Sequence, residues 1–136
     1  MWGRRRGVDL IDTPEMAAFF EQLDHLNGAQ LLGLRAAWQA ISLAAHQGAW
    51  AAVRAVGVAE GLTKEIDRVR NKALGWASRG TNVAPYTLSD PITWQQTKLE
   101  AGEAIVDAAL AVALGSRLDA AHREVLIAPW LRATEV

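Results

Sequence analysis

From Gly28 onward, alanine, leucine and tryptophan recur at the spacing of an α-helix, and the 136-residue chain carries six tryptophans and no cysteine. Apolar residues at positions i, i+3, i+4 and i+7 form one stripe on a helix, and that stripe must pack against other helices. The pattern predicts an all-α single domain, an up-and-down bundle of four main helices plus a short C-terminal helix. We assign residues 14–136 to this bundle and residues 1–13 to a flexible basic arm.

Local signals suggest where the helices begin and end. Thr13-Pro14-Glu15 is typical of a helix start, because a hydroxyl caps the helix, proline needs no amide partner and an acid faces the positive end. The apolar stripe keeps one phase from Leu31 to Val56, which predicts one long helix from about Ala29 to Glu60 with Gly48 as its weakest point. The later helices are expected at about 64–79, from Pro91 to Gly115, and from a capping box at Ser116-x-x-Asp119 to about Ala128, followed by a final turn at 129–131.

The expected core consists of residues that lie on the apolar stripe of their own helix. The stretch from Ala104 to Leu114 is apolar on nearly all sides and is interrupted by Asp107, as is typical of a central helix. The predicted core residues are Phe20, Leu23, Leu34, Trp38, Ile41, Val53, Val56, Ile66, Val69, Leu99, Val106 and Leu110.

The charge balance argues against several classes of partner. Fourteen basic and fifteen acidic residues give a formal net charge of -1, so no global field attracts nucleic acid or an anionic membrane. A basic edge near Lys64 and Arg68 is expected to be a salt-bridged outer face, because Glu60–Lys64 and Asp67–Arg70 have the spacing of helical ion pairs.

Signals for export or membrane insertion are weak. The basic start of the chain is followed by Asp9 and Asp12 rather than by an apolar signal segment, and the longest uncharged run, residues 36–53, contains several polar side chains. The absence of cysteine excludes disulfides and thiolate chemistry. We therefore expect a cytoplasmic protein without a membrane partner.

A stripe of carboxylates suggests one possible chemistry. Glu100, Glu103 and Asp107 lie within about 60° on one predicted helix, and such oxygen ligands suit Mg²⁺ or Mn²⁺. The stripe resembles that of the all-α nucleotide pyrophosphohydrolases, which place Glu-x-x-Glu on one helix and Glu-x-x-Asp on the next. Glu100-x-x-Glu103 matches the first half, whereas Glu21-x-x-Asp24 supplies the second half in the wrong order. A solvated acidic edge is the competing interpretation.

The three histidines offer no comparable pattern. His25, His46 and His122 form no i, i+4 pair and no Glu-x-x-His motif, so they do not predict a metal site. No catalytic residue is identified from any motif.

The segment from Gly80 to Pro91 is the longest predicted loop, and loops often carry function. Four polar or aromatic residues in or beside it are candidates for binding a small ligand: Arg79, Asn82, Tyr86 and Trp94. The alternative is that its aromatic residues close one end of the bundle.

Two functional hypotheses follow. The first is a non-enzymatic binding or assembly module without a cofactor, which forms a homodimer or binds a protein partner. It is favoured by the apolar faces of the fourth helix and by Trp2 and Trp130 near the termini, because exposed apolar patches and tryptophans are typical of interfaces. The second is a metal-dependent hydrolase that uses the carboxylate stripe.

Overall fold

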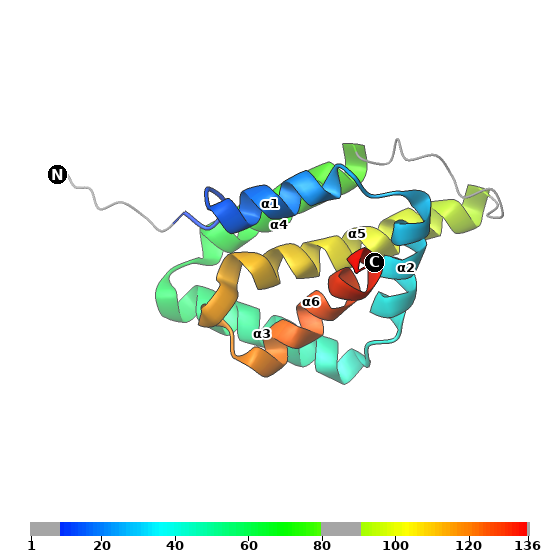
Figure 1. Ribbon diagram of the computed structural model, residues 1–136. Helices are drawn as coiled ribbons and strands as arrows, with labels where there is room; N and C mark the ends of the chain where they lie inside the picture. Colours follow the sequence, from blue (N-terminus) through cyan, green and yellow to red (C-terminus); the bar gives the residue numbers. More distant parts are fainter. Residues whose placement is uncertain (1–8, 80–90, 136) are drawn as a thin grey trace.

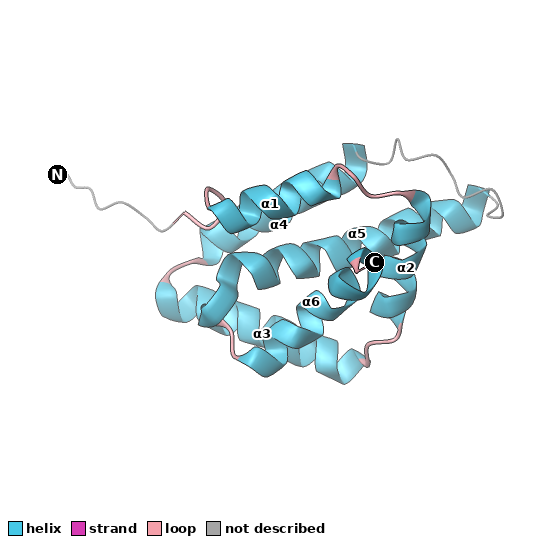
Figure 2. Cartoon of the chain, viewed as in Figure 1, coloured by secondary structure: helices cyan, strands magenta, loops and turns pink. Residues whose placement is uncertain are grey.

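The computed structural model describes residues 9–79 and 91–135, and all regular structure in these residues is helical (Figures 1 and 2). This confirms the all-α class. The described residues form six α-helices and one 3₁₀ helix, rather than four main helices and a short one. The elements are α1 (Pro14–Leu23), α2 (Gly28–Gln39), α3 (Leu43–Glu60), α4 (Thr63–Arg79), α5 (Pro91–Leu114), η2 (Gly115–Arg117) and α6 (Ala120–Thr134).

The prediction of one helix from Ala29 to Glu60 is wrong. The chain breaks between Gln39 and Leu43, and Gly48 lies inside α3. Ser42 causes the restart, because its backbone is extended and its hydroxyl accepts a hydrogen bond from the Ala45 amide at 3.1 Å. The apolar stripe continues across the break and therefore conceals it.

Other helix ends follow ordinary capping chemistry. The Thr13 hydroxyl accepts from the Met16 amide, which confirms the predicted start of α1. Asn27 and Gln30 form a capping box at the start of α2. The last helix begins after Asp119, not after Ser116, and continues through Pro129 to Thr134.

Helix α5 is the central element. It packs against α1, α2, α4 and α6, and Figure 1 shows it running through the middle of the molecule between α1 and α6. All residues from 104 to 111 are buried. The apolar faces of this segment are thus covered within one chain.

Most of the predicted core is correct. Leu23, Leu34, Val53, Ile66, Val69, Val106 and Leu110 are buried, and Phe20, Trp38, Ile41 and Val56 are partly buried. Leu99 is wrong, since 66% of it is exposed. At about 100° per residue it lies opposite the buried residues Trp94, Thr97 and Ala101, which face the interior from the same half of α5.

The packed part of the chain begins before α1. Leu10, which we had placed in the N-terminal arm, is 2% exposed, and the Asp9 carboxylate accepts hydrogen bonds from the Ile11 and Asp12 amides. An apolar side chain held by a local turn joins the core here. Residues 1–8 of the predicted arm lie outside the described residues.

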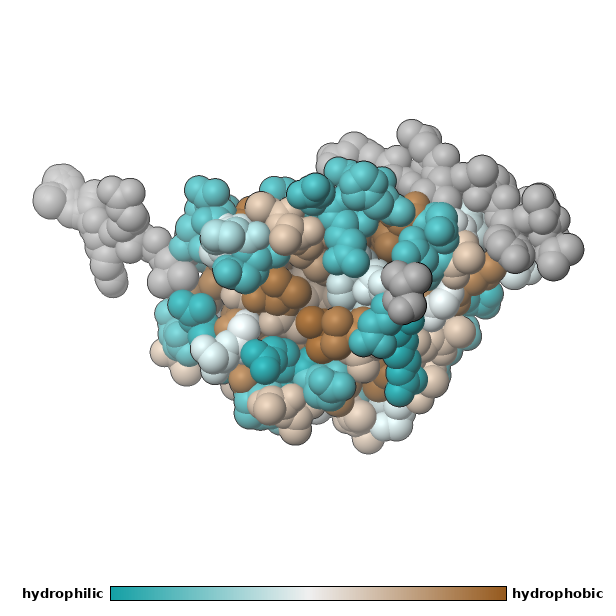
Figure 3. Space-filling model, viewed as in Figure 1, coloured by the Kyte–Doolittle hydropathy of each residue, from teal (hydrophilic) through white to brown (hydrophobic). Residues whose placement is uncertain are grey.

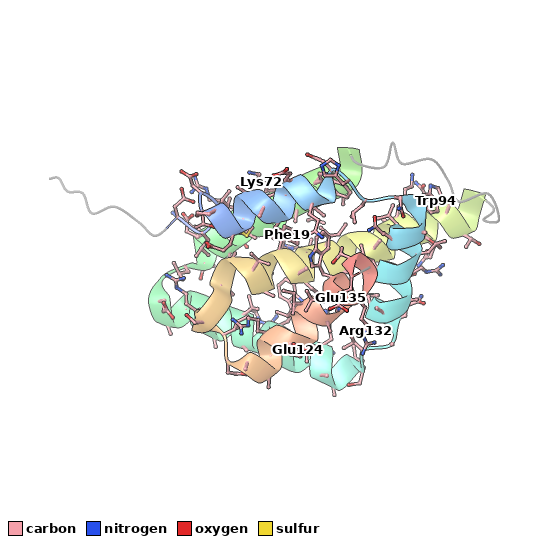
Figure 4. The ribbon with its side chains drawn as sticks, in the orientation of Figure 1. Phe19, Lys72, Trp94, Glu124, Arg132 and Glu135 are labelled. Carbon is pink, nitrogen blue, oxygen red and sulfur yellow. The ribbon has the colours of Figure 1, made fainter. Side chains whose placement is uncertain are left out.

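Aromatic contacts hold α1 on the bundle. The Phe19 ring lies 4.6 Å from the Trp130 ring, and Lys72 Nζ lies 4.6 Å from the Phe20 centroid, so that α6 and α4 both contact α1. Figure 4 shows Phe19 beneath α1 and Lys72 beside it. Trp130 is 4% exposed and therefore belongs to the core.

The two features that suggested a homodimer have explanations within one chain or lie beyond what the structure describes. Residues 104–111 of α5 are buried, Trp130 is buried, and Trp2 is outside the described residues. On the face shown in Figure 3, apolar surface forms patches bordered by polar side chains. Self-association stays a prediction without structural support.

In the described ranges 9–79 and 91–135, no helix combines the length and apolar character that crossing a bilayer requires.

Candidate functional site

A groove lies between α3 and α4, which diverge from the turn at Gly61 and Leu62. Gly61 adopts a left-handed conformation with φ of 67°, which allows the chain to reverse abruptly. Near this turn the two helices meet closely, because a Cβ on Gly57 would lie 3.1 Å from Ile66 Cδ1 and 3.3 Å from Thr63 Oγ1. The glycine thus permits the closed end of the groove.

The groove encloses about 790 Å³ and has side chains of three helices in its walls. This volume falls within the range typical of small-molecule sites. The lining residues are His46, Gln47, Trp50, Val53, Arg54, Gly57 and Val58 from α3, Thr63, Ile66, Asp67 and Arg70 from α4, and Glu103 from α5.

The character of the lining changes along the groove. Its closed end, beside the turn, is lined by Gly57, Val58 and Ile66. His46 lies about 22 Å along α3 from Gly61, given a rise of about 1.5 Å per residue. Gly57, Val58 and Ile66 thus lie near the turn, where Thr63 and Asp67 also line the groove, and His46 lies at the opposite end.

Four charged side chains line the groove without pairing to another described residue: Arg54, Asp67, Arg70 and Glu103. All four residues are exposed. The ion pair expected between Asp67 and Arg70 does not form, and Glu60 pairs with Arg117 instead of Lys64. Two positive and two negative groups consequently face one space.

One wall of the groove is anchored by a buried carboxylate. Asp107 on α5 has a side chain that is 1% exposed. Its Oδ1 accepts a hydrogen bond from the Trp50 indole at 2.8 Å, and its Oδ2 accepts one from the Trp38 indole at 3.2 Å. His46 Nε2 lies 2.6 Å from the same Oδ2. We call these four residues the Asp107 cluster.

The cluster fixes the position of His46 and, while Asp107 is ionised, its tautomer. An ionised carboxylate has no proton to give, so Nε2 of His46 carries the proton in this hydrogen bond. The ring also lies edge-on between two indoles, with centroids 5.9 Å from Trp38 and 6.5 Å from Trp50. His46 is thereby held at the groove with its Nδ1 atom free of Asp107.

Burial dominates the electrostatics of this carboxylate. It raises the pKa of Asp107 above its ordinary value of 3.8, and the attraction and hydrogen bond of His46 and the two indole hydrogen bonds partly oppose the rise. A buried acid with a perturbed pKa beside a cleft is a recognised mark of a functional site.

The predicted carboxylate stripe separates into three different surroundings. Asp107 belongs to its cluster, Glu103 lines the groove, and Glu100 accepts hydrogen bonds from Gln39 and Gln96. Among the described residues, no three side chains of the metal-binding types come together. A divalent ion at Asp107 would also have to displace three N–H donors, so this geometry does not support the metal hypothesis.

The loop candidates cannot be brought together as a site. Trp94 is 5% exposed and belongs to the core rather than to the groove. Asn82, Tyr86 and the side chain of Arg79 lie outside the described residues.

The sequence analysis missed the residues that hold the groove wall. Trp38 was expected in the core, His46 was expected not to form a metal site, and no prediction was made for Trp50. One available signal was Asp107 itself, because a single acid on a helix buried on all sides requires hydrogen-bond donors from its neighbours. Which residues donate could not be predicted, because His46 and Trp50 lie 61 and 57 residues from Asp107 on another helix.

Comparison with known proteins adds no identification: no family model matches the chain, and neither a curated protein nor a solved structure matches it. Function must therefore be argued from the chemistry of the groove.

Proposed function

We propose that this protein is a non-enzymatic binding module that takes a small molecule with an apolar part into the groove between α3 and α4. The observation that carries the proposal is a groove of about 790 Å³ with apolar residues near its closed end and a wall fixed by a buried carboxylate. Most small-molecule sites combine such an apolar lining with a few fixed polar groups.

The Asp107 cluster supports this proposal through pre-organisation. Trp50 and His46 line the groove and are also tied to Asp107, so neither has to be ordered when a ligand binds. Ordering a mobile side chain costs about 0.5–1.5 kcal/mol on binding, and fixed groups avoid that cost.

The stability of the core alone does not explain why a buried carboxylate is present in the cluster. Well-packed apolar residues often stabilise a fold as well as a buried ionic group does. A role in presenting His46 and Trp50 to a ligand explains why a carboxylate is placed in the otherwise apolar segment of α5.

Binding is favoured over metal-dependent hydrolysis because of how the acids are placed. Glu100 and Asp107 have separate partners, Glu103 pairs with no other described residue, and the groove presents charged groups of both signs. Such a lining suits recognition of a ligand by complementary charge.

The proposal is tested by titrating the protein with small amphiphiles of neutral, anionic, cationic and zwitterionic type, while amide chemical shifts are followed by NMR. We expect shifts that saturate and that centre on Trp50, Val53 and Ile66. Absence of saturable shifts for every compound class would contradict the proposal.

A matched pair of variants controls for non-specific apolar binding. Val58 lines the groove and is 80% exposed, whereas Leu99 is 66% exposed and lies away from it. Val58→Arg should weaken binding because it places a charge at the closed end, and Leu99→Arg should leave binding unchanged. Equal effects of the two substitutions would show that the compounds bind elsewhere.

A further inference from the structure

The charges in the groove restrict the kind of ligand that fits it. Arg54 lies on α3, Asp67 and Arg70 on α4, and Glu103 on α5, so the four groups come from all three helices that line the space. None of their side chains forms an ion pair or hydrogen bond with another residue in the described ranges. Charge of both signs is therefore available to a bound molecule.

A ligand with a single charge satisfies half of this set. An anion could pair with Arg54 or Arg70, but Asp67 and Glu103 would repel it. A cation would meet the opposite problem. A molecule that carries both charges can use both sets, and hydrogen bonds between ionised groups are about twice as strong as those between neutral ones.

The closed end of the groove adds a second requirement. Val58, which is exposed, and Ile66 offer an apolar surface beside the charged groups. An apolar side chain placed there gains roughly 25 cal/mol for each Å² that it removes from water. The ligand must then join a short apolar body to a zwitterionic head.

We propose that the groove binds a free amino acid with an apolar side chain, whose carboxylate is held by the groove arginines and whose ammonium is held by Asp67 and Glu103. The inference rests on the proposed binding function of the same groove. Arginine suits the carboxylate because its planar guanidinium can donate two parallel hydrogen bonds. The side chain of the amino acid lies toward the closed end.

The test compares ligands that differ by one charged group. L-phenylalanine is compared with 2-phenylethylamine, which lacks the carboxylate, and with 3-phenylpropanoate, which lacks the ammonium. We expect phenylalanine to bind at least about tenfold more tightly than either analogue, as measured by calorimetry or NMR titration. L-leucine, with its corresponding amine and acid, repeats the comparison with an aliphatic side chain.

Charge-removing variants assign the two ends of the ligand. Arg54→Gln and Arg70→Gln should weaken phenylalanine and phenylpropanoate but not phenylethylamine. Asp67→Asn and Glu103→Gln should weaken phenylalanine and phenylethylamine but not phenylpropanoate. All four residues are exposed, so these variants should remain folded, and thermal unfolding checks that they do.

Matched controls lie on α6, where Figure 4 shows Glu124 and Arg132. Both residues are exposed and neither lines the groove. Glu124→Gln and Arg132→Gln change the net charge in the same way as the groove variants, and we expect them to leave all the affinities unchanged.

The outcomes separate this inference from the function on which it rests. If a single-charge analogue binds as tightly as phenylalanine and Val58→Arg weakens it, the groove is a binding site but the ligand class is wrong. The ligand class is also wrong if the charge variants fail to sort the ligands. If no compound of any class binds, both the inference and the proposed function are overturned.

Discussion

Asp107 and Glu100 lie on the same helix seven residues apart, and both accept hydrogen bonds from α2. Their surroundings nevertheless shift the two pKa values in opposite directions. Asp107 is buried and accepts from two indoles and a histidine, and burial raises its pKa. Glu100 lies near the surface, where the hydrogen bond from Gln96, with further support from Gln39 and Arg35, lowers its pKa below the ordinary 4.5. Two acids with similar numbers of hydrogen-bond partners therefore have oppositely shifted pKa values because one is buried and the other is not.

The contrast explains why one acid is tied to the groove and the other is not. The partners of Glu100 are long side chains that water can replace, whereas the rings around Asp107 fill the interior and have nowhere else to go. The rigid carboxylate is thus the one that positions groove residues.

The largest effect is expected from removing the buried acid. Asp107→Ala leaves the Trp38, His46 and Trp50 N–H groups without their acceptor, and loss of one partner from a buried ionic group costs about 3–5 kcal/mol. Urea unfolding measures the change in the free energy of unfolding. Glu100→Ala is the control and should cost much less, because water can solvate its partners.

If Asp107→Ala does not fold, Asp107→Asn provides the same comparison. An amide keeps the shape but presents a donor where the carboxylate had an acceptor, so at least one N–H remains unsatisfied at a cost of about 1–3 kcal/mol. Equal losses in the free energy of unfolding for substitutions at Asp107 and at Glu100 would contradict the comparison.

The next effect concerns single donors to the carboxylate. Trp50→Phe removes an indole N–H while keeping an aromatic ring, and loss of a hydrogen bond to a charged group costs about 1.5–3 kcal/mol. Trp38→Phe should cost less than Trp50→Phe, because its hydrogen bond is 3.2 Å long rather than 2.8 Å. Both are measured by urea unfolding.

Trp76 supplies the matched control for these substitutions. Its indole donates to Asp24 at 2.9 Å, but this hydrogen bond is exposed. Trp76→Phe should therefore be the mildest of the three changes. A larger cost at Trp76 than at Trp50 would show that burial of the carboxylate does not decide the energetics.

The two acids should also respond to pH in opposite directions. The raised pKa of Asp107 means that its contribution to stability is full below the ordinary value of 3.8 and is lost as the pH rises through the folded-state pKa. The lowered pKa of Glu100 means that its contribution is present above 4.5 and is lost as the pH falls through the folded-state pKa.

This difference is measured by urea unfolding of the wild type, Asp107→Asn and Glu100→Gln from neutral to acidic pH. As the pH falls, the wild type should gain stability relative to Asp107→Asn and lose stability relative to Glu100→Gln. If the stability of the wild type changed in the same direction relative to both variants, the contrast between Asp107 and Glu100 would be wrong.

The helical class and most of the core could be predicted from the sequence because they depend on local periodicity. Leu99 was assigned to the wrong face since the first half of α5 buries Thr97, a polar residue that a hydrophobic stripe does not count. The helix count failed at Ser42, where a cap interrupts a stripe that remains in phase.

The candidate site could be predicted only in part. Spacing drew attention to Glu103 and Asp107, but it gave Asp107 the wrong partners. The donors to Asp107 lie 57 to 69 residues away in the chain, on helices whose packing no local pattern determines. The groove also depends on the packing of α3 against α4, which approach each other closely at Gly57.

The smallest effect is expected at the break that sequence periodicity concealed. Ser42→Ala removes the cap of α3 and should cost about 1 kcal/mol by urea unfolding. Asn27→Ala removes the equivalent cap of α2 and should cost a similar amount. The two caps differ in the residues that follow them. The start of α3 carries His46 and Trp50, which contact Asp107, whereas the first turn of α2 carries no hydrogen-bond donor to Asp107. Near-UV circular dichroism, which reports on tryptophan surroundings, should therefore change with Ser42→Ala and not with Asn27→Ala. Unchanged spectra for both variants would mean that Asp107 holds its donors without help from the helix cap.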